Sequence, residues 1–267
     1  MGNGLCITTD YLTDHGDPSP SLRHIADAGF THIHWCHHWK TDFIYSRWEI
    51  SQIRRWLSEY GLRLLDLHGS VGPEKDWTSL RDYERLAGVE LVKNRIEMTA
   101  RLGGEVTIMH IHEWPCCEPV MKSLSELEPF AKKRNVRIAI ENGKFNDIRH
   151  VFSRWAPDFL GLCYDAGHGN IAGDGLDELE RLKDRLISIH LHDNDSGADQ
   201  HNLLFSGTVD WARLAAIIAR SSYHKCASME VSMDNAAISD ETAFLQCAFD
   251  TGMRFSQMIE HERSRKL

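Results

Sequence analysis

The chain has 267 residues, 42% of them hydrophobic, and its 39 acidic and 30 basic side chains give it a net charge of −9. The acidic balance argues against general affinity for nucleic-acid backbones, and no apolar run reaches the roughly 18 residues that a membrane span needs. Because no linker-like or low-complexity segment divides it, we expect one domain over residues 1–267, close to the roughly 250 residues of an α/β barrel.

A short β-type run at residues 4–8 opens the chain, and helical spacing follows over 19–28, with Pro20 near the helix start and Gly29 as the stop. Alternating residues predict a second strand at 30–36, and the amphipathic spacing of residues 48–60 predicts the helix that follows it. The same pattern then repeats. It predicts strands at 62–68, 106–111, 136–141, 160–164, 186–191 and 226–231, and helices at 83–102, 124–133, 145–155, 176–183, 211–220 and 242–258.

Eight strands that alternate with eight helices in one chain of this length are typical of an α/β fold with a closed parallel sheet. The pattern therefore favours a (β/α)8 TIM barrel over an open doubly wound sheet. In such a barrel the active site lies at the carboxyl ends of the strands.

Six of the predicted strands end in a residue that can bind a metal, whereas Asp, Glu and His make up only about a fifth of the chain. Composition alone predicts one or two such ends. The six residues are His68, His110, Glu141, Asp165, His190 and Glu230, and the adjoining loops add His168, Asp199 and His201.

The segment Ile187-Ser-Ile-His190-Leu-His192-Asp193 is a strand that leads directly into this group. Histidines at i and i+2 lie on one face of a strand, so one of His190 and His192 is predicted to be a ligand. A single histidine is more often an ordinary core or surface residue, and the prediction therefore depends on the other strand ends.

A mixture of carboxylates and imidazoles suits a divalent transition metal, Mn, Co, Fe or Zn, rather than Mg or Ca. The minimal ligand set is Glu141, Asp165, His190 and Glu230, with coordination positions left open for substrate or water. The alternative is a hydrogen-bonded network without an ion, which would leave excess carboxylate charge at close range.

Two further groups have less specific patterns. Trp35, Trp39, Trp77 and Trp114 lie near strand ends, where aromatic rings either stack on sugars or pack within loops. The histidines at 32, 34, 37 and 38 have no carboxylate near them in sequence, and we interpret them as surface and pocket polarity rather than a metal site. Seven cysteines without a C-x-x-C pair favour reduced thiols and a cytoplasmic location.

The order of these motifs resembles the xylose isomerase-like barrels, a superfamily that includes sugar epimerases, hydroxypyruvate isomerase, inosose dehydratase and the endonuclease IV group. The matching motifs are Asp66-Leu-His68, Ile108-Met-His110, Ile140-Glu141-Asn142, Tyr164-Asp165-Ala-Gly-His168, His190-Leu-His-Asp193, Asp199-Gln-His201 with Gly207 and Trp211, and Ser228-Met-Glu230.

The resemblance implies that Glu141, Asp165, His190 and Glu230 hold a divalent metal, with His192 in a position where many relatives have lysine. It assigns proton transfer to Glu141 and Glu230. It also implies substrate contacts from His68, His110, His168, His192 and Trp114, and it leaves His68, His110, His168, Asp199 and His201 as candidate ligands of additional ions.

By this resemblance the chain is expected to be an isomerase or epimerase of a small sugar or related polyol ketone. It would act through a metal-stabilised enediolate, with the two glutamates moving the proton. The alternatives are an endonuclease IV-like zinc phosphodiesterase acting on abasic DNA and an inosose dehydratase-like lyase, while a non-catalytic barrel ranks last. The arginine that follows strand seven in some ketose epimerases has no clear equivalent here. The expected partner of the protein is a small sugar, and neither nucleic acid nor a membrane is expected to bind. Self-association into a homo-oligomer is left open.

Overall fold

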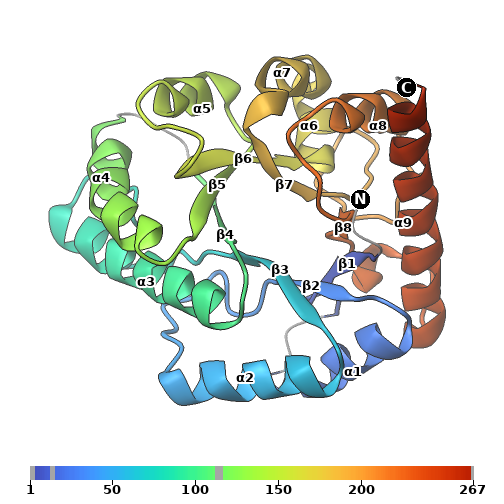
Figure 1. Ribbon diagram of the computed structural model, residues 1–267, viewed down its shortest axis with the longest axis horizontal. Helices are drawn as coiled ribbons and strands as arrows, with labels where there is room; N and C mark the ends of the chain where they lie inside the picture. The colour runs from blue at the N-terminus through green and yellow to red at the C-terminus, as the bar shows by residue number, and fades with distance from the viewer. Residues whose placement is uncertain (1–3, 13–15, 112–116, 266–267) are drawn as a thin grey trace.

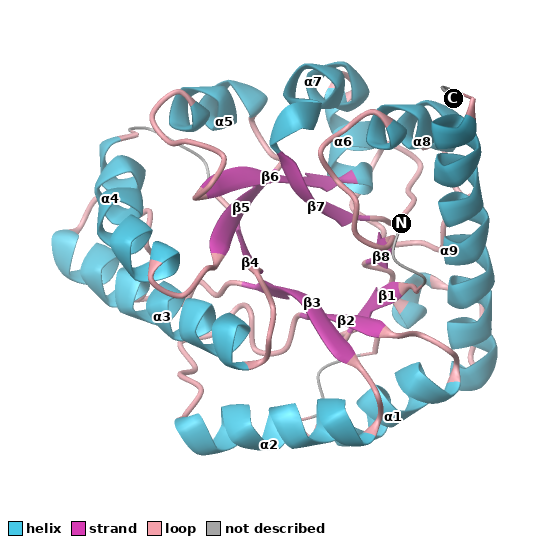
Figure 2. Ribbon diagram, viewed as in Figure 1, coloured by secondary structure: helices cyan, strands magenta, loops and turns pink. Residues whose placement is uncertain are grey.

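Eight parallel strands form the centre of the molecule, and the helices that connect them surround it (Figures 1 and 2). The computed structural model describes residues 4–12, 16–111 and 117–265. The strands are β1 (Cys6–Thr8), β2 (His32–Trp35), β3 (Arg63–His68), β4 (Val106–Met109), β5 (Arg137–Glu141), β6 (Leu160–Asp165), β7 (Leu186–His190) and β8 (Ser228–Met229).

The strands pair in chain order from β1 to β7, and β8 pairs with the other side of β1. A parallel bridge between Leu191 and Met229 brings the β7 and β8 segments together and closes the ring. The predicted TIM barrel is therefore confirmed, and the strand ends that carry the candidate site converge on one mouth.

The helices are α1 (Ser19–Asp27), α2 (Arg47–Glu59), α3 (Asp82–Arg101), α4 (Glu118–Lys132), α5 (Phe145–Phe152), α6 (Ala166–Ala172), α7 (Gly175–Leu182), α8 (Trp211–Ala219) and α9 (Glu241–Ser264). α2 illustrates how the sequence determines them. Ser46 and Glu49 form a reciprocal capping box at its start, which contributes about 1 kcal/mol. Its buried Ile50, Ile53 and Leu57 face the barrel.

Two helices depart from the prediction for local reasons. The sequence analysis missed α6, because Gly167 and Gly169 are poor helix formers, and the helix depends on Asp165, whose side chain accepts a hydrogen bond from the His168 amide at 2.6 Å. α4 begins at Glu118 rather than near residue 124, because Pro119 is well tolerated in a first turn.

The main apolar core lies between the strands and the helix layer, and two small clusters of buried side chains come mostly from the strands themselves. Within the described ranges, no helix combines the length and the apolar character needed to cross a bilayer.

Candidate active site

Buried acids and histidines gather where the strands end at the mouth of the barrel. His68 ends β3, Glu141 ends β5, Asp165 ends β6 and His190 ends β7, while His110 and Glu230 directly follow β4 and β8. All of these side chains are buried except that of His110, which is about a quarter exposed. The predicted strand-end residues therefore lie close together, and the contacts among them form three groups.

The first group lies at the centre, where His190 sits between the two glutamates. Its Nδ1 atom is 3.3 Å from Glu141 Oε2 and 3.1 Å from Glu230 Oε2. Both carboxylates thus approach one ring nitrogen. On the adjoining strand, Asp165 pairs in register with His190.

Asp165 is fully buried and contacts His192, whose Nε2 is 3.1 Å from both of its carboxylate oxygens. His192 is also fully buried, and its ring stacks on that of His201 at 4.1 Å. Gly167 makes room for it, because a Cβ atom there would lie 1.9 Å from His192 Cε1.

The second group consists of His68, His110 and Glu141. The Nε2 atoms of the two histidines are 3.1 Å apart, and they lie 3.7 and 3.4 Å from Glu141 Oε2. His68 Nδ1 donates to the Gly69 carbonyl at 2.9 Å, which leaves Nε2 directed at the group.

The third group is held together by Asp199. Its Oδ2 atom is 3.3 Å from His168 Nε2 and 3.2 Å from His201 Nε2. His201 Nδ1 donates to the Glu230 carbonyl at 2.7 Å, and the residue has a positive φ of 48°. A non-glycine residue in this conformation is held there by its surroundings, here by that hydrogen bond.

His34 was not predicted to be part of this site, and Asp66 was named only within the motif Asp66-Leu-His68, without a role. His34 was interpreted as surface or pocket polarity, which is wrong, because it is fully buried inside the barrel. Its Nδ1 is 2.8 Å from Asp66 Oδ1, and its Nε2 is 3.6 Å from Glu230 Oε1. Ser188 Oγ donates to the other oxygen of Asp66, so this chain of contacts supports Glu230 from below.

The remaining predicted residues are placed as follows. Trp35 and Trp77 are buried in the core, whereas Trp39 lies at the mouth with its ring centroid 4.7 Å from that of His68. Trp114 lies outside the described residues.

A cavity of about 630 Å³ opens above the three groups. This volume is within the range of small-molecule sites in proteins. It is lined by Trp39, Lys40, His68, Val71, Gly72, Pro73, His110, Glu141, His168, Asp199, His201 and Glu230.

The pKa values of the cluster are set by burial and by the contacts between histidines and acids. Burial and the neighbouring His190 disfavour protonation of His34, but Asp66 and Glu230 outweigh them and raise its pKa to about 9. Asp165 raises the pKa of His168 to about 11 despite burial. Against the cost of burial, Asp199 and Glu230 raise the pKa of His201 to about 10. Burial lowers the pKa of His110 to about 4.

The carboxylates show the matching shift. Burial favours their neutral forms, but His110 and His190 hold the pKa of Glu141 well below its usual range, and His190 does the same for Glu230. Histidines with raised pKa values therefore offset part of the carboxylate charge when no ion is bound.

The donor atoms fit a divalent ion. Two ligand atoms that each bind an ion at about 2.1 Å lie roughly 3.0–3.5 Å apart, and the distances from His190 Nδ1 to the two glutamates have this size. Neither ring nitrogen of His190, nor Glu141 Oε2, makes an aligned hydrogen bond within the described part of the chain. Buried polar atoms without partners are costly, and an ion between His190 Nδ1 and Glu141 Oε2 would satisfy these two atoms.

We expect metal affinity to rise with pH, because a histidine must lose its proton before it binds an ion. His168 and His201 have pKa values raised to about 11 and about 10, so at neutral pH their binding to metal would release protons. Calorimetric titration with Mn, Co and Zn in buffers of different ionisation enthalpy measures this release. A heat that is independent of the buffer would contradict the expectation.

The two histidines of β7 can be distinguished by mutation. If His190 is the ligand, His190→Ala should weaken metal binding by at least about 100-fold, since even residues that only support ligands contribute 10–100-fold. His192→Ala should weaken metal binding less, by about tenfold, because His192 would only orient Asp165. Metal titrations, with thermal melts as the folding control, compare the two. A larger loss for His192→Ala would transfer the ligand role to that residue.

Comparisons with known proteins agree with the fold. Residues 22–247 match the family described as xylose isomerase-like TIM barrel. The uncharacterised protein y4fM of Sinorhizobium fredii is 34% identical, with 97% of both chains covered. A probable endonuclease 4 of Staphylococcus saprophyticus is 28% identical over 51% of this chain and 55% of its own.

Among solved structures, an L-ribulose 3-epimerase superposes with a TM-score of 0.80 over 98% of this chain and 96% of its own, at 16% identity. At this identity the likeness concerns the fold.

Proposed function

Because the chain belongs to the xylose isomerase-like TIM barrel family, we propose that it is a divalent-metal-dependent isomerase or epimerase of a small sugar or related polyol ketone. One observation carries the proposal. Two buried glutamates, Glu141 and Glu230, come from β5 and from the end of β8, approach the same nitrogen of His190, and border the same cavity.

In the proposed reaction, one glutamate removes the proton from the carbon next to the substrate carbonyl, and the other returns a proton to that carbon or its neighbour. Return to the opposite face of the same carbon gives an epimer. Return to the former carbonyl carbon, with the neighbouring hydroxyl proton moving to the former carbonyl oxygen, interconverts aldose and ketose. Glu141, Asp165, His190 and Glu230 would hold the metal, whose chemistry is to polarise the carbonyl and acidify the adjacent C–H bond.

The other residues at the mouth suit a polyhydroxylated substrate. His68, His110 and His168 line the cavity and offer ring nitrogens to hydroxyl groups, and Trp39 presents an apolar face to the sugar ring. His192 was also predicted to contact substrate, but its full burial beside His201 suits a supporting role. The superposition with an L-ribulose 3-epimerase is consistent with the proposal.

A second candidate is metal-dependent hydrolysis of a phosphoester. The observation that favours it is the extra ligand capacity: the group of His68, His110 and Glu141 and the group held by Asp199 flank the central one and could hold further ions. A probable endonuclease 4 is among the relatives. We rank this function second, because Lys40 is the one lysine or arginine among the described residues that line the cavity.

A substrate screen tests the proposal. Ketoses, aldoses and their phosphates would be incubated in D₂O with protein loaded with Mn, Co or Zn, and carbon-bound deuterium would be followed by NMR. An epimerase or isomerase incorporates deuterium into substrate and product, whereas a dehydratase-like lyase also loses water. If no sugar exchanges with any of the metals while a phosphoester is cleaved, the second candidate takes its place.

A further inference from the structure

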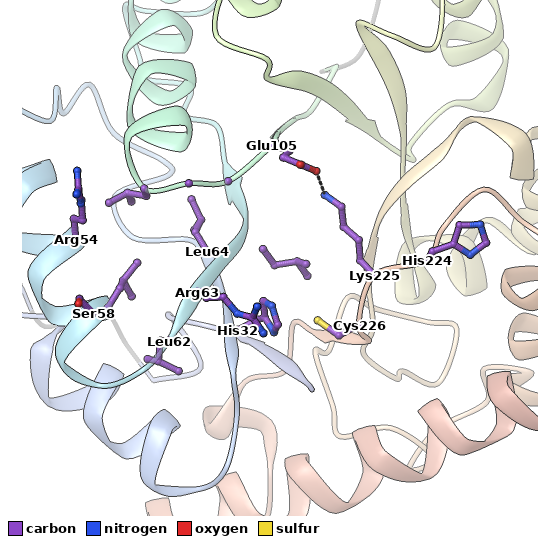
Figure 3. Close-up of a pocket in the computed structure, with 15 residues that line it drawn as sticks. His32, Arg54, Ser58, Leu62, Arg63, Leu64, Glu105, His224, Lys225 and Cys226 are labelled. Carbon is purple, nitrogen blue, oxygen red and sulfur yellow. Dashed lines mark ion pairs between the residues drawn. The ribbon is translucent and has the colours of Figure 1, made fainter. Parts of the chain in front are cut away.

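A second cavity lies at the other end of the barrel, where the strands begin (Figure 3). Its volume is about 580 Å³, close to that of the cavity at the mouth. It is bordered by the starts of β2 and β3, the second half of α2, residues 102–105 after α3, and residues 224–226 before β8. Nothing in the proposed reaction uses it.

The pairing of β3 explains the opening. β3 pairs with β2 from Arg63 onward, but with β4 only through Leu67 and His68. The first four residues of β3 therefore have no ladder partner in β4 within the described residues, and the two strands separate at this end. Backbone groups on such an edge need water or a ligand as partner.

The lining of the cavity is positively charged in a chain of net charge −9. Arg63 and Lys225 both lie near His32. Burial lowers the pKa of His32, and the positive charge of each of these two residues lowers it further. Burial raises the pKa of the Cys226 thiol, and the positive charges of Lys225 and Arg63 both act to lower it. Arg54 adds a third cation at the edge, and Figure 3 shows it apart from the other two.

Glu105 is the one acid among the lining residues. Its Oε2 is 3.3 Å from Lys225 Nζ, and a dashed line joins the two side chains in Figure 3. The Glu105 side chain is 68% exposed, so its charge is well screened by solvent. Arg63 is also exposed but forms no ion pair within the described residues, so its positive charge is left without an acidic partner.

Five leucines form the apolar part of the wall, beside the polar side chains of His32, Ser58 and His224. Leu57, Leu62, Leu64, Leu65 and Leu102 line it, and Leu65 joins Cys6 and Cys226 in a small buried cluster. Gly104 lets the turn after α3 come close to this wall, because a Cβ atom there would lie 2.8 Å from Leu64 Cδ2.

We propose that this cavity binds a small amphipathic anion. A carboxylate or phosphate head pairs with Arg63 and Lys225, and a short aliphatic body lies against Leu64 and Leu102. An oxyanion without the body would gain only solvent-screened ion pairs, and an alkyl group without the charge would leave the cations unpaired. Both parts are therefore needed for binding.

The test is calorimetric titration of the metal-loaded full chain with hexanoate and with butyl phosphate, alongside inorganic phosphate and butanol as the half-probes. At least one amphipathic anion should bind at least about tenfold more tightly than either half-probe. The two anions distinguish a carboxylate from a phosphate head. Arg63→Gln and Lys225→Gln should each weaken binding about fivefold, the upper range for partly exposed ion pairs.

Glu105→Gln should act in the opposite direction and tighten binding, because it frees Lys225 for the ligand. The matched control is Arg154→Gln, an exposed arginine after α5 that does not line the cavity. Because the measurement needs no catalytic activity, its result is independent of the proposed function. The inference fails if no probe binds below about 10 mM, or if the Arg63 and Lys225 variants bind like the control.

Discussion

Replacing Glu141 or Glu230 with glutamine is expected to lower kcat by about 10²–10⁴-fold, the range that a positioned general acid or base contributes. The amide keeps the shape of the side chain but loses its basicity. Both side chains are almost fully buried, at 3% and 8% exposed, so a solvent molecule cannot readily replace either one. The loss should appear in kcat under metal saturation, because glutamine is also a poorer metal ligand.

Proton exchange separates the two glutamates in an epimerase. If they serve opposite faces of the substrate, each variant should still exchange the substrate hydrogen of one epimer with D₂O while failing to invert it. Glu59→Gln, at the exposed end of α2, is the matched control and should leave both rates unchanged. Near wild-type turnover in both metal-saturated variants would rule out the proton shuttle, whatever the fold.

The positions of the strand-end residues could be predicted from sequence, because barrel topology converts chain order into position. Once eight strands alternate with eight helices, residues as distant as His68 and Glu230 must meet at one mouth. His190 and Asp165 lie side by side because β6 and β7 are neighbouring strands that pair at these two residues. The sequence pattern could not decide which of His190 and His192 would bind a metal, because residues at i and i+2 share one face of a strand, and both are fully buried within the same cluster.

The roles of His34 and Asp66 were missed for a different reason. Which side chains of a strand point into a barrel depends on register, and the β2–β3 pairing shifts between Ile33 and His34. A local irregularity of this kind has no clear sequence signal. The cavity at the start of the strands could not be predicted from the sequence either. It arises where the first residues of β3 do not pair with β4, and no sequence motif marks it.

The charge of the His-rich mouth also predicts how the protein should act on DNA. We expect cleavage of an abasic duplex to be at least about 1,000-fold slower than turnover of the best sugar, since phosphate contacts supply most of the affinity for DNA. The chain carries a net charge of −9, and Asp199, Glu141 and Glu230 border the cavity opposite a single lysine, Lys40. A polyanionic backbone would meet repulsion there unless bound ions reverse it.

The assay would measure nicking of a duplex with one abasic site by protein loaded with Zn or Mn at 50 and 200 mM salt. Glu141→Gln prepared in the same way controls for contaminating nucleases. Bound ions could reverse the charge, because each divalent ion brings two positive charges whereas His168 and His201 would each release only one proton. Nicking that is abolished by Glu141→Gln and falls steeply with salt would therefore mean that the three ligand groups are filled together. It would also make phosphoester hydrolysis the principal reaction, while nicking that persists in the variant would be assigned to a contaminant and would leave the sugar reaction in place.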